Sequence, residues 1–264
     1  MTQFDPTRFA GRRALVTGAS RGIGAGIAQR LAAEGADVAI VARTVSHHPT
    51  LPGSLRATAE LLAAHGGRVA TIVADLSDPE DRARIVPEAV DGLGGSIDIL
   101  VNNAAAAIYQ PLAEYPLRRL RLTYAVNVEA PFELMQAVLP GMRAAGEGWI
   151  VNLSSATARL RPGPPFTRGA GSRMAVYGSS KAALNRLTNA MGDELWGSGI
   201  RVNTVEPRGG VMTEGASALL GSLPDDQIES LDEMVEAAVA LSDCPPDRTG
   251  QVVVSLDLLA ELSR

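Results

Sequence analysis

The stretch Thr17-Gly18-Ala19-Ser20-Arg21-Gly22-Ile23-Gly24 decides the fold. It follows a short apolar run, residues 13–17, and opens an alanine-rich segment over 22–34, so it predicts a strand, a tight turn and a helix. Glycine permits close backbone approach, and the first N–H groups of a helix favour an anion. Any tight strand-to-helix turn uses glycines, but this position favours a dinucleotide pyrophosphate. The expected contacts are Gly18, Ser20, Arg21, Gly22, Ile23 and Gly24.

Short apolar runs alternate with helical patterns along the rest of the chain. The runs predict strands over residues 13–17, 37–42, 68–74, 98–101, 149–153, 200–205 and 251–255. Helices are predicted over 22–34, 54–65, 79–90, 117–145, with a break near Pro131, and 175–196. Such alternation implies right-handed crossovers, and continuously apolar strands imply cover on both faces. We predict an α/β class, single-domain doubly wound Rossmann fold with a seven-stranded parallel sheet and helices on both faces.

No linker divides the chain, so residues 1–264 are expected to form one dinucleotide-binding and catalytic domain. The composition limits its partners, because the formal net charge is −5. A mildly acidic chain has no overall field that attracts nucleic acid or an anionic membrane. No apolar run reaches the ~18 residues of a membrane span, and the N-terminus is polar, so a cytoplasmic location is expected.

Cysteine and histidine give no sign of a metal site. The single cysteine, Cys244, cannot form an intrachain disulfide, which fits a reducing compartment. A catalytic or metal-binding thiol is the alternative to a structural one, but no partner residues cluster with it. The histidines His47, His48 and His65 lack the spacing of metal ligands, so no metal is expected.

The end of the second predicted strand bears on the choice of cofactor. NAD enzymes commonly place a carboxylate there to bind the ribose 2′-hydroxyl. Here the strand ends Val41-Ala42-Arg43-Thr44, without an acidic residue. Arg43 and Arg21 are suited to hold a 2′-phosphate through charge-assisted hydrogen bonds, unless both are solvated surface charges. We predict NADP(H) as the cofactor in preference to NAD(H).

Tyr177 and Lys181 stand four residues apart near the start of a helical segment, so they share a helix face. A free phenol has a pKa of about 10, which a nearby ammonium lowers. The tuned hydroxyl then exchanges a proton with a carbonyl or alcohol oxygen. Lys181 is the only lysine among the 24 lysine and arginine residues, as expected where an amine is required.

Two further polar positions are candidates for the site. Ser155 closes a predicted strand, where its hydroxyl is suited to bind a substrate oxygen, although serine is also common in turns. Asn127 stands within a helical region, where asparagine is not preferred. A helix irregularity that holds a water and a surface position are both open explanations for Asn127.

These motifs together resemble the short-chain dehydrogenase/reductase family over most of the chain, from Arg13 to about Ser255. The family pattern TGxxxGxG is met by residues 17–24, and YxxxK by residues 177–181. The resemblance implies an oxidoreductase that moves a hydride between a nicotinamide and a carbonyl or alcohol substrate. It makes Tyr177 the general acid/base and gives Lys181 the roles of tuning Tyr177 and binding the nicotinamide ribose. Ser155 would hold the substrate oxygen and Asn127 a water.

The resemblance also implies further cofactor contacts, which are Asp75, Leu76, Asn103, Pro207 and Thr213. Departures from the family pattern accompany them. Ala105 replaces a usual glycine, and Arg208 intervenes after Pro207, which lengthens the spacing to Thr213. The gap between Ser155 and Tyr177 is longer than is usual, and the extra residues form an inserted loop over about 159–173, beside the expected substrate site. The segment 47–54 resembles a branch that includes hydroxysteroid-dehydrogenase-like proteins.

The expected partner is a small-molecule carbonyl or alcohol. The arginines of the inserted loop suit an anionic substrate, or are ordinary solvated charges; they are Arg159, Arg161, Arg168 and Arg173. By resemblance, a homo-oligomer, a dimer or tetramer, forms through the long helices 117–145 and 175–196. Two other functions remain open: a non-catalytic NADP(H)-binding sensor or structural subunit, and an epimerase or dehydratase on the same fold.

Overall fold

A parallel sheet runs through the molecule, as the computed structural model shows for residues 4–46, 49–166, 173–221, 224 and 227–264. Its strand order is β3-β2-β1-β4-β5-β6-β9, and every pairing is parallel. The predicted seven-stranded Rossmann sheet is therefore confirmed. The strands are β1 (Arg13–Thr17), β2 (Asp37–Ala42), β3 (Val69–Val73), β4 (Ile99–Asn102), β5 (Gly148–Leu153), β6 (Ile200–Glu206) and β9 (Val252–Val254).

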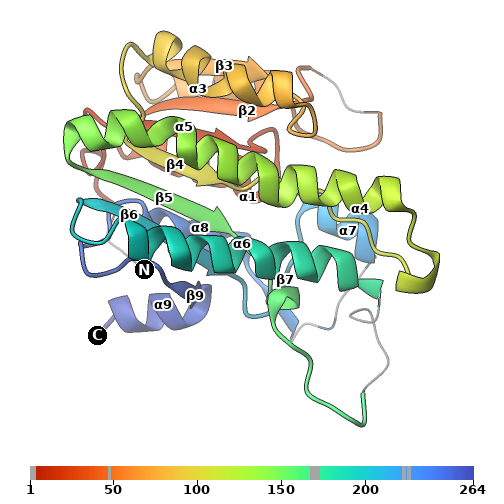
Figure 1. The fold of residues 1–264 in the computed structure, drawn as a ribbon. Helices are drawn as coiled ribbons and strands as arrows, with labels where there is room; N and C mark the ends of the chain where they lie inside the picture. The colour runs from red at the N-terminus through yellow and green to blue at the C-terminus, as the bar shows by residue number, and fades with distance from the viewer. Residues whose placement is uncertain (1–3, 47–48, 167–172, 222–223, 225–226) are drawn as a thin grey trace.

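Helices cover both faces of this sheet (Figure 1). One layer packs α1 against α2 and α8, and α8 against α9; these are α1 (Gly22–Ala33), α2 (Leu55–Ala63), α8 (Leu231–Leu241) and α9 (Ser255–Leu262). The other layer holds α3 (Pro79–Leu93), α4 (Leu117–Tyr124), α5 (Ala130–Ala145) and α6 (Ala175–Glu194). Side chains of β1 alternate between two apolar clusters, with Val16 in one and Leu15 in the other. The strands are continuously apolar because both faces are buried.

The long helical region breaks upstream of the predicted position. A π-helical segment, Ala125–Glu129, separates α4 from α5. Pro131 lies two residues beyond this segment, in the first turn of α5, and supplies no N–H to the helical backbone that continues through the region. Two short strands, β7 (Gly210–Val211) and β8 (Ile228–Glu229), form a separate parallel pair that the sequence did not predict, and α7 (Glu214–Leu220) lies between them.

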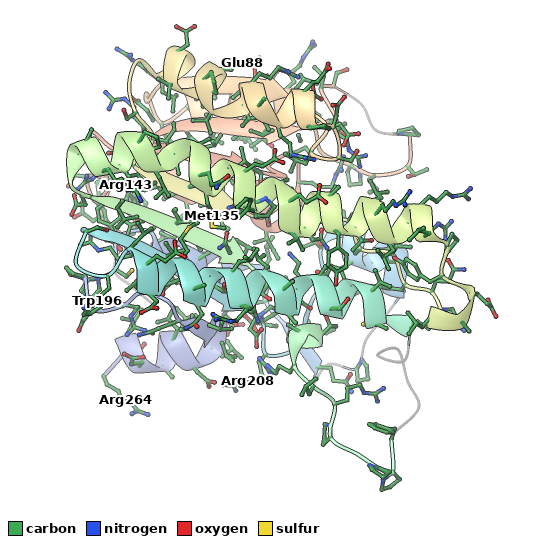
Figure 2. All side chains as sticks on the ribbon, in the orientation of Figure 1. Glu88, Met135, Arg143, Trp196, Arg208 and Arg264 are labelled. Atoms are coloured by element: carbon green, nitrogen blue, oxygen red, sulfur yellow. The ribbon has the colours of Figure 1, made fainter. Side chains whose placement is uncertain are left out.

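Several expectations are not tested by this structure. His47, His48 and Arg168 lie outside the described residues. Within the described ranges, no helix is long and apolar enough to cross a membrane, and no three metal-ligating side chains come together. Pairing with a second copy through α4, α5 and α6 stays a prediction. Figure 2 shows Met135 beneath α5, where it is fully buried, and Trp196 past the end of α6, where it is 64% exposed.

Polar side chains attach α6 to the sheet. Thr188 Oγ1 accepts hydrogen bonds from Asn152 Nδ2 at 2.9 Å and Thr204 Oγ1 at 2.8 Å, and donates to the Leu184 carbonyl. Asn152 in turn accepts from Asn102 Nδ2 at 2.9 Å. This fully buried network ties β4, β5 and β6 to α6, the helix that carries Tyr177 and Lys181.

Replacing Thr188 with valine tests this network at nearly constant shape. Thr188→Val leaves the Asn152 amide and the Thr204 hydroxyl without their acceptor, so the free energy of unfolding should fall by about 2 kcal/mol or more. The matched control is Thr71→Val, at an exposed position of the edge strand β3, which should change stability by no more than about 0.5 kcal/mol. Urea denaturation measures both, and equal stability of the two variants would contradict the role of the network.

Candidate functional site

A cavity of about 1570 Å³ opens where β1, β2, β4, β5 and β6 end. In an open α/β sheet, ligands bind outside the carboxyl ends of the strands. Most of the predicted site residues line this cavity: Gly18, Ser20, Arg21, Ile23, Arg43, Asp75, Leu76, Asn103, Ser155, Tyr177, Lys181, Pro207 and Thr213. Gly22, Gly24 and Asn127 do not line it, and each has a packing role described below.

The glycines of the β1–α1 turn are required by close contacts. A Cβ on Gly18 would lie 2.8 Å from the Ala104 Cα, and one on Gly24 would lie 2.3 Å from Asn103 Nδ2. Gly18 and Gly22 also have positive φ values, which glycine adopts without strain. Helix α1 begins without a side-chain cap or an acidic residue in its first turn. The turn therefore fits an anionic group such as a pyrophosphate.

Arg21 holds a neighbouring loop. Its Nε donates to the Pro52 carbonyl at 2.7 Å and its Nη2 to the Gly53 carbonyl at 2.9 Å. A Cβ on Gly53 would lie 2.5 Å from the Ser20 carbonyl oxygen, so this loop packs directly on the glycine turn. Ser54 then caps α2 by accepting from the Ala57 N–H. These contacts give Pro52, Gly53 and Ser54 of the segment 47–54 a structural role. They also occupy two of the hydrogen-bond donors of Arg21.

Arg43 lies at the end of β2 with its side chain 72% exposed, and its Nη1 is 3.7 Å from Asp75 Oδ2. Burial raises the pKa of Asp75, but hydrogen bonds from the N–H and hydroxyl of Ser77, together with Arg43, outweigh it and lower the pKa. Asp75 is therefore an ionised acceptor beside Arg43, and both residues line the cavity.

Tyr177, Lys181 and Ser155 come together as predicted. Tyr177 lies in the first turn of α6, and Lys181 follows one turn later, buried to 2% exposure. Lys181 Nζ donates to the Leu153 carbonyl at 2.6 Å and lies 5.9 Å from the centre of the Tyr177 ring. Ser155 follows β5 and lines the same cavity as Tyr177, whose pKa its hydroxyl lowers. Oxygen and amine groups thus converge at one end of the sheet.

The predicted lowering of the Tyr177 pKa is wrong for the protein alone. Burial raises this pKa above its ordinary value of 10, and the phenol of Tyr109 raises it further, whereas the hydrogen bond with Ser155 lowers it. Burial also lowers the pKa of Lys181 from 10.5 to about 8. Burial is the largest cause of both shifts, because removal from water disfavours the charged form of each group.

Asn127 is fully buried in the π-helical segment, so a surface position is excluded. Its Oδ1 accepts from the Ala106 N–H at 2.7 Å, and its Nδ2 donates to Ser180 Oγ at 2.9 Å. Ser180 Oγ donates to the Tyr177 carbonyl at 2.7 Å. Asn127 therefore positions the first turn of α6, and the helix irregularity is what turns its side chain toward that helix.

The segment after β6 contains the longer spacing between Pro207 and Thr213. Thr213 caps α7 by accepting from the Ala216 N–H, and its methyl group would lie 3.1 Å from a Cβ on Gly22. The Arg208 N–H donates to Glu229 at 2.9 Å, next to the β7–β8 pair. The longer spacing between Pro207 and Thr213 thus accommodates a short strand, and both residues still line the cavity.

Sequence reasoning missed two contributors to the cavity. The ring of Tyr109 meets the ring of Tyr177 edge to face, with centroids 5.7 Å apart. Thr157 donates to Ser155 Oγ from both its N–H and its hydroxyl. Neither residue stands at a distinctive spacing, so no pattern in the sequence indicates them. Arg159, one of the loop arginines that the sequence associates with an anionic substrate, lines the same cavity and pairs with the buried Glu206.

Comparison with known proteins places the chain among dehydrogenases. The short chain dehydrogenase family model matches residues 12–220. Hydroxysteroid dehydrogenase-like protein 2 from Xenopus tropicalis is 35% identical over 252 residues, which is 96% of this chain and 58% of that protein. The human protein of the same name is 32% identical over 254 residues, 96% of this chain and 59% of its own length. The chain therefore spans less than two thirds of these relatives.

Solved structures give the same result. A short-chain type dehydrogenase/reductase from Mycobacterium marinum superposes with a TM-score of 0.80 at 30% identity, covering 95% of both chains. A proposed NAD(P)-dependent gluconate 5-dehydrogenase from Beutenbergia cavernae, with bound NADP, has a TM-score of 0.80 at 32% identity over 97% of this chain and 99% of its own. A 3-oxoacyl (acyl-carrier-protein) reductase from Agrobacterium tumefaciens, with NADP bound, has a TM-score of 0.78 at 30% identity over 93% of each. The chain belongs to the short-chain dehydrogenase/reductase family.

Proposed function

We propose that this chain is an NADP(H)-dependent oxidoreductase that moves a hydride between the cofactor and a carbonyl or alcohol, with Tyr177 as general acid/base. The observation that carries the proposal is the convergence of Ser155 and Lys181 on Tyr177 at the carboxyl edge of the sheet. The adjacent glycine turn, which has no room for a Cβ at Gly18, fits the cofactor pyrophosphate. A pure binder would lose little without the Ser155 and Tyr177 hydroxyls.

Each residue has a definite task in this proposal. A bound nicotinamide supplies or accepts the hydride. Ser155 holds the substrate oxygen by a hydrogen bond, and the Tyr177 hydroxyl donates its proton to that oxygen as negative charge develops. The raised pKa of Tyr177 keeps the phenol protonated at neutral pH, which is the form that carbonyl reduction needs. Lys181 stabilises the phenolate left behind, and Asn127 fixes the backbone of Tyr177 through Ser180.

Replacing Tyr177 with phenylalanine removes the proton donor and keeps the ring. Tyr177→Phe should lower kcat for NADPH-dependent carbonyl reduction by about 10²–10⁴-fold while NADPH binding persists. Absorbance at 340 nm across aldehydes, ketones and 3-oxoacyl thioesters measures turnover. Tyr124→Phe is the matched control, because Tyr124 does not itself line the cavity and its hydroxyl donates to Ser179 Oγ. Tight NADPH binding without turnover of any carbonyl by the wild type would favour the non-catalytic sensor or structural subunit.

The preference for NADP(H) rests on Arg43. Its guanidinium stands at the end of β2, where an NAD enzyme commonly has a carboxylate, and its Nη1 lies 3.7 Å from Asp75 Oδ2. Arg21 lies within the glycine turn and is the second candidate for the 2′-phosphate, although two of its donors hold the loop carbonyls of Pro52 and Gly53. The NADP in the Beutenbergia and Agrobacterium structures supports the same preference.

Arg43→Ala should raise the KM for NADPH by about tenfold or more, since a charge-assisted hydrogen bond contributes about 1.5–3 kcal/mol. The KM for NADH should change little, because the ribose 2′-hydroxyl carries no charge. Steady-state kinetics with both cofactors test this, with Arg56→Ala on the exposed side of α2 as the control. An equal loss for the two cofactors would show that Arg43 does not bind the 2′-phosphate.

Lys181 should give stability a specific pH dependence, because its pKa is about 8 in the folded chain against an ordinary 10.5. Between these values the unfolded chain binds more protons, so the free energy of unfolding rises with pH. From pH 8 to 10, the wild type should gain about 2 kcal/mol relative to Lys181→Met in urea denaturation. The subtraction cancels Cys244, whose pKa burial raises to about 11. Parallel pH profiles would contradict this assignment.

A further inference from the structure

We infer that the substrate carries a carboxylate or a similar anionic group, and that Arg159 binds it. This inference rests on the proposed function for its place in catalysis. Arg159 follows Ser155 by four residues, lines the same cavity as Ser155 and Tyr177, and keeps 44% of its side chain exposed there. It therefore lies on the substrate side of the cavity, apart from the cofactor-side Arg21 and Arg43.

The guanidinium of Arg159 is held in place by contacts with Glu206 and Pro207. Its Nε donates to Glu206 Oε1 at 2.6 Å, and its Nη2 is 3.5 Å from the Pro207 carbonyl oxygen. The Glu206 side chain is only 4% exposed and does not line the cavity. Its second oxygen is 3.5 Å from Asn185 Nδ2 of α6. A buried carboxylate thus fixes the fork of Arg159 in one orientation before any ligand arrives.

The remaining donors of Arg159 are available. Within the part of the chain that the structure describes, Nη1 has no hydrogen-bond partner and Nη2 has only the long contact to Pro207. The Nη1–Nη2 edge of a guanidinium matches the two oxygens of a carboxylate. An arginine that served only to neutralise Glu206 would not need to line the cavity and keep 44% of its side chain exposed.

The charge of the cavity wall agrees with an anionic ligand. Arg161 and Arg208 line the cavity together with Arg159, and Arg208 also forms an ion pair with Asp257, which does not line it. Among the described residues, the carboxylates on the cavity wall are Asp75, on the cofactor side, and Glu229, which accepts from the Arg208 N–H. Of the other loop arginines, Arg173 does not line the cavity and Arg168 lies outside the described residues. Arg159 lines the cavity and its guanidinium is held by the buried Glu206, so we assign the anion to this arginine.

The test compares hexanoate with hexanamide, which have the same length and nearly the same shape but differ in charge. Titration calorimetry on the full chain, with and without NADPH, should give at least about tenfold tighter binding of hexanoate. Arg159→Met alone would leave Glu206 buried without its partner. The variant is therefore Arg159→Met with Glu206→Gln, which should lose the preference for hexanoate. Arg56→Met, on the exposed face of α2, is the control and should retain it.

Equal binding of hexanoate and hexanamide, or a preference that survives in the double variant, would overturn the inference. A kinetic arm compares reduction of 3-oxohexanoate with that of its methyl ester at saturating NADPH, where kcat/KM should favour the anion by at least about tenfold. A hexanoate preference without any turnover would leave the anion site standing and refute the proposed function. If the methyl ester is reduced as fast as the acid and hexanoate binds no more tightly than hexanamide, the proposed function stands and the anion site at Arg159 is refuted.

Discussion

The polar attachment of α6 to the sheet is the constraint on which the site depends. Lys181, Asn185 and Thr188 stand on one face of this helix and contact Leu153, Glu206 and Asn152 of β5 and β6. Hydrogen bonds are directional, so they set both the rotation of the helix and its height over the strands, whereas apolar contacts tolerate sliding. The position of Tyr177 relative to Ser155 follows from this attachment.

Two glycines let the helix come close enough for these bonds. A Cβ on Gly178 would lie 2.5 Å from the Thr157 carbonyl oxygen, and one on Gly192 would lie 2.4 Å from the backbone of Gly250. The helix therefore touches backbone near both of its ends, with the buried polar network between them. Because the same helix carries the proton donor and the lysine, a small shift of α6 would move both groups at once.

Much of the fold follows from local pattern. The bounds of β1 and β2 match the sequence prediction, since a doubly buried strand must be apolar throughout. The β7–β8 pair was missed because two residues are too few to show a period. The break before α5 lies a few residues upstream of Pro131, in the π-helical segment that contains Asn127, an asparagine whose place in a helix indicates such an irregularity. The tertiary contact of Asn127 with Ser180, 53 positions away, explains this irregularity, and sequence order does not reveal such a contact.

The site was predictable where chemistry demands a particular residue type, as at the glycine turn and at Lys181. It was not predictable where a common residue acquires its role from its neighbour, as Arg159 does from Glu206 and Arg21 from the carbonyls of Pro52 and Gly53. The direction of the Tyr177 pKa also required the structure. Burial and the position of Lys181 Nζ at the Leu153 carbonyl set that balance, and neither can be read from a spacing of four residues.

The single lysine has a consequence for the chemistry of the whole surface. Every other basic side chain in the sequence is arginine or histidine, so no lysine amine is available on the exterior for acylation, cross-linking or conjugation. A reagent that modifies lysine side chains has one target, which is 2% exposed and lies on the wall of the cavity beside Tyr177. Labelling of that amine therefore reports how often the interior of the cavity opens to a solute, free of the surface background that lysine-rich proteins give.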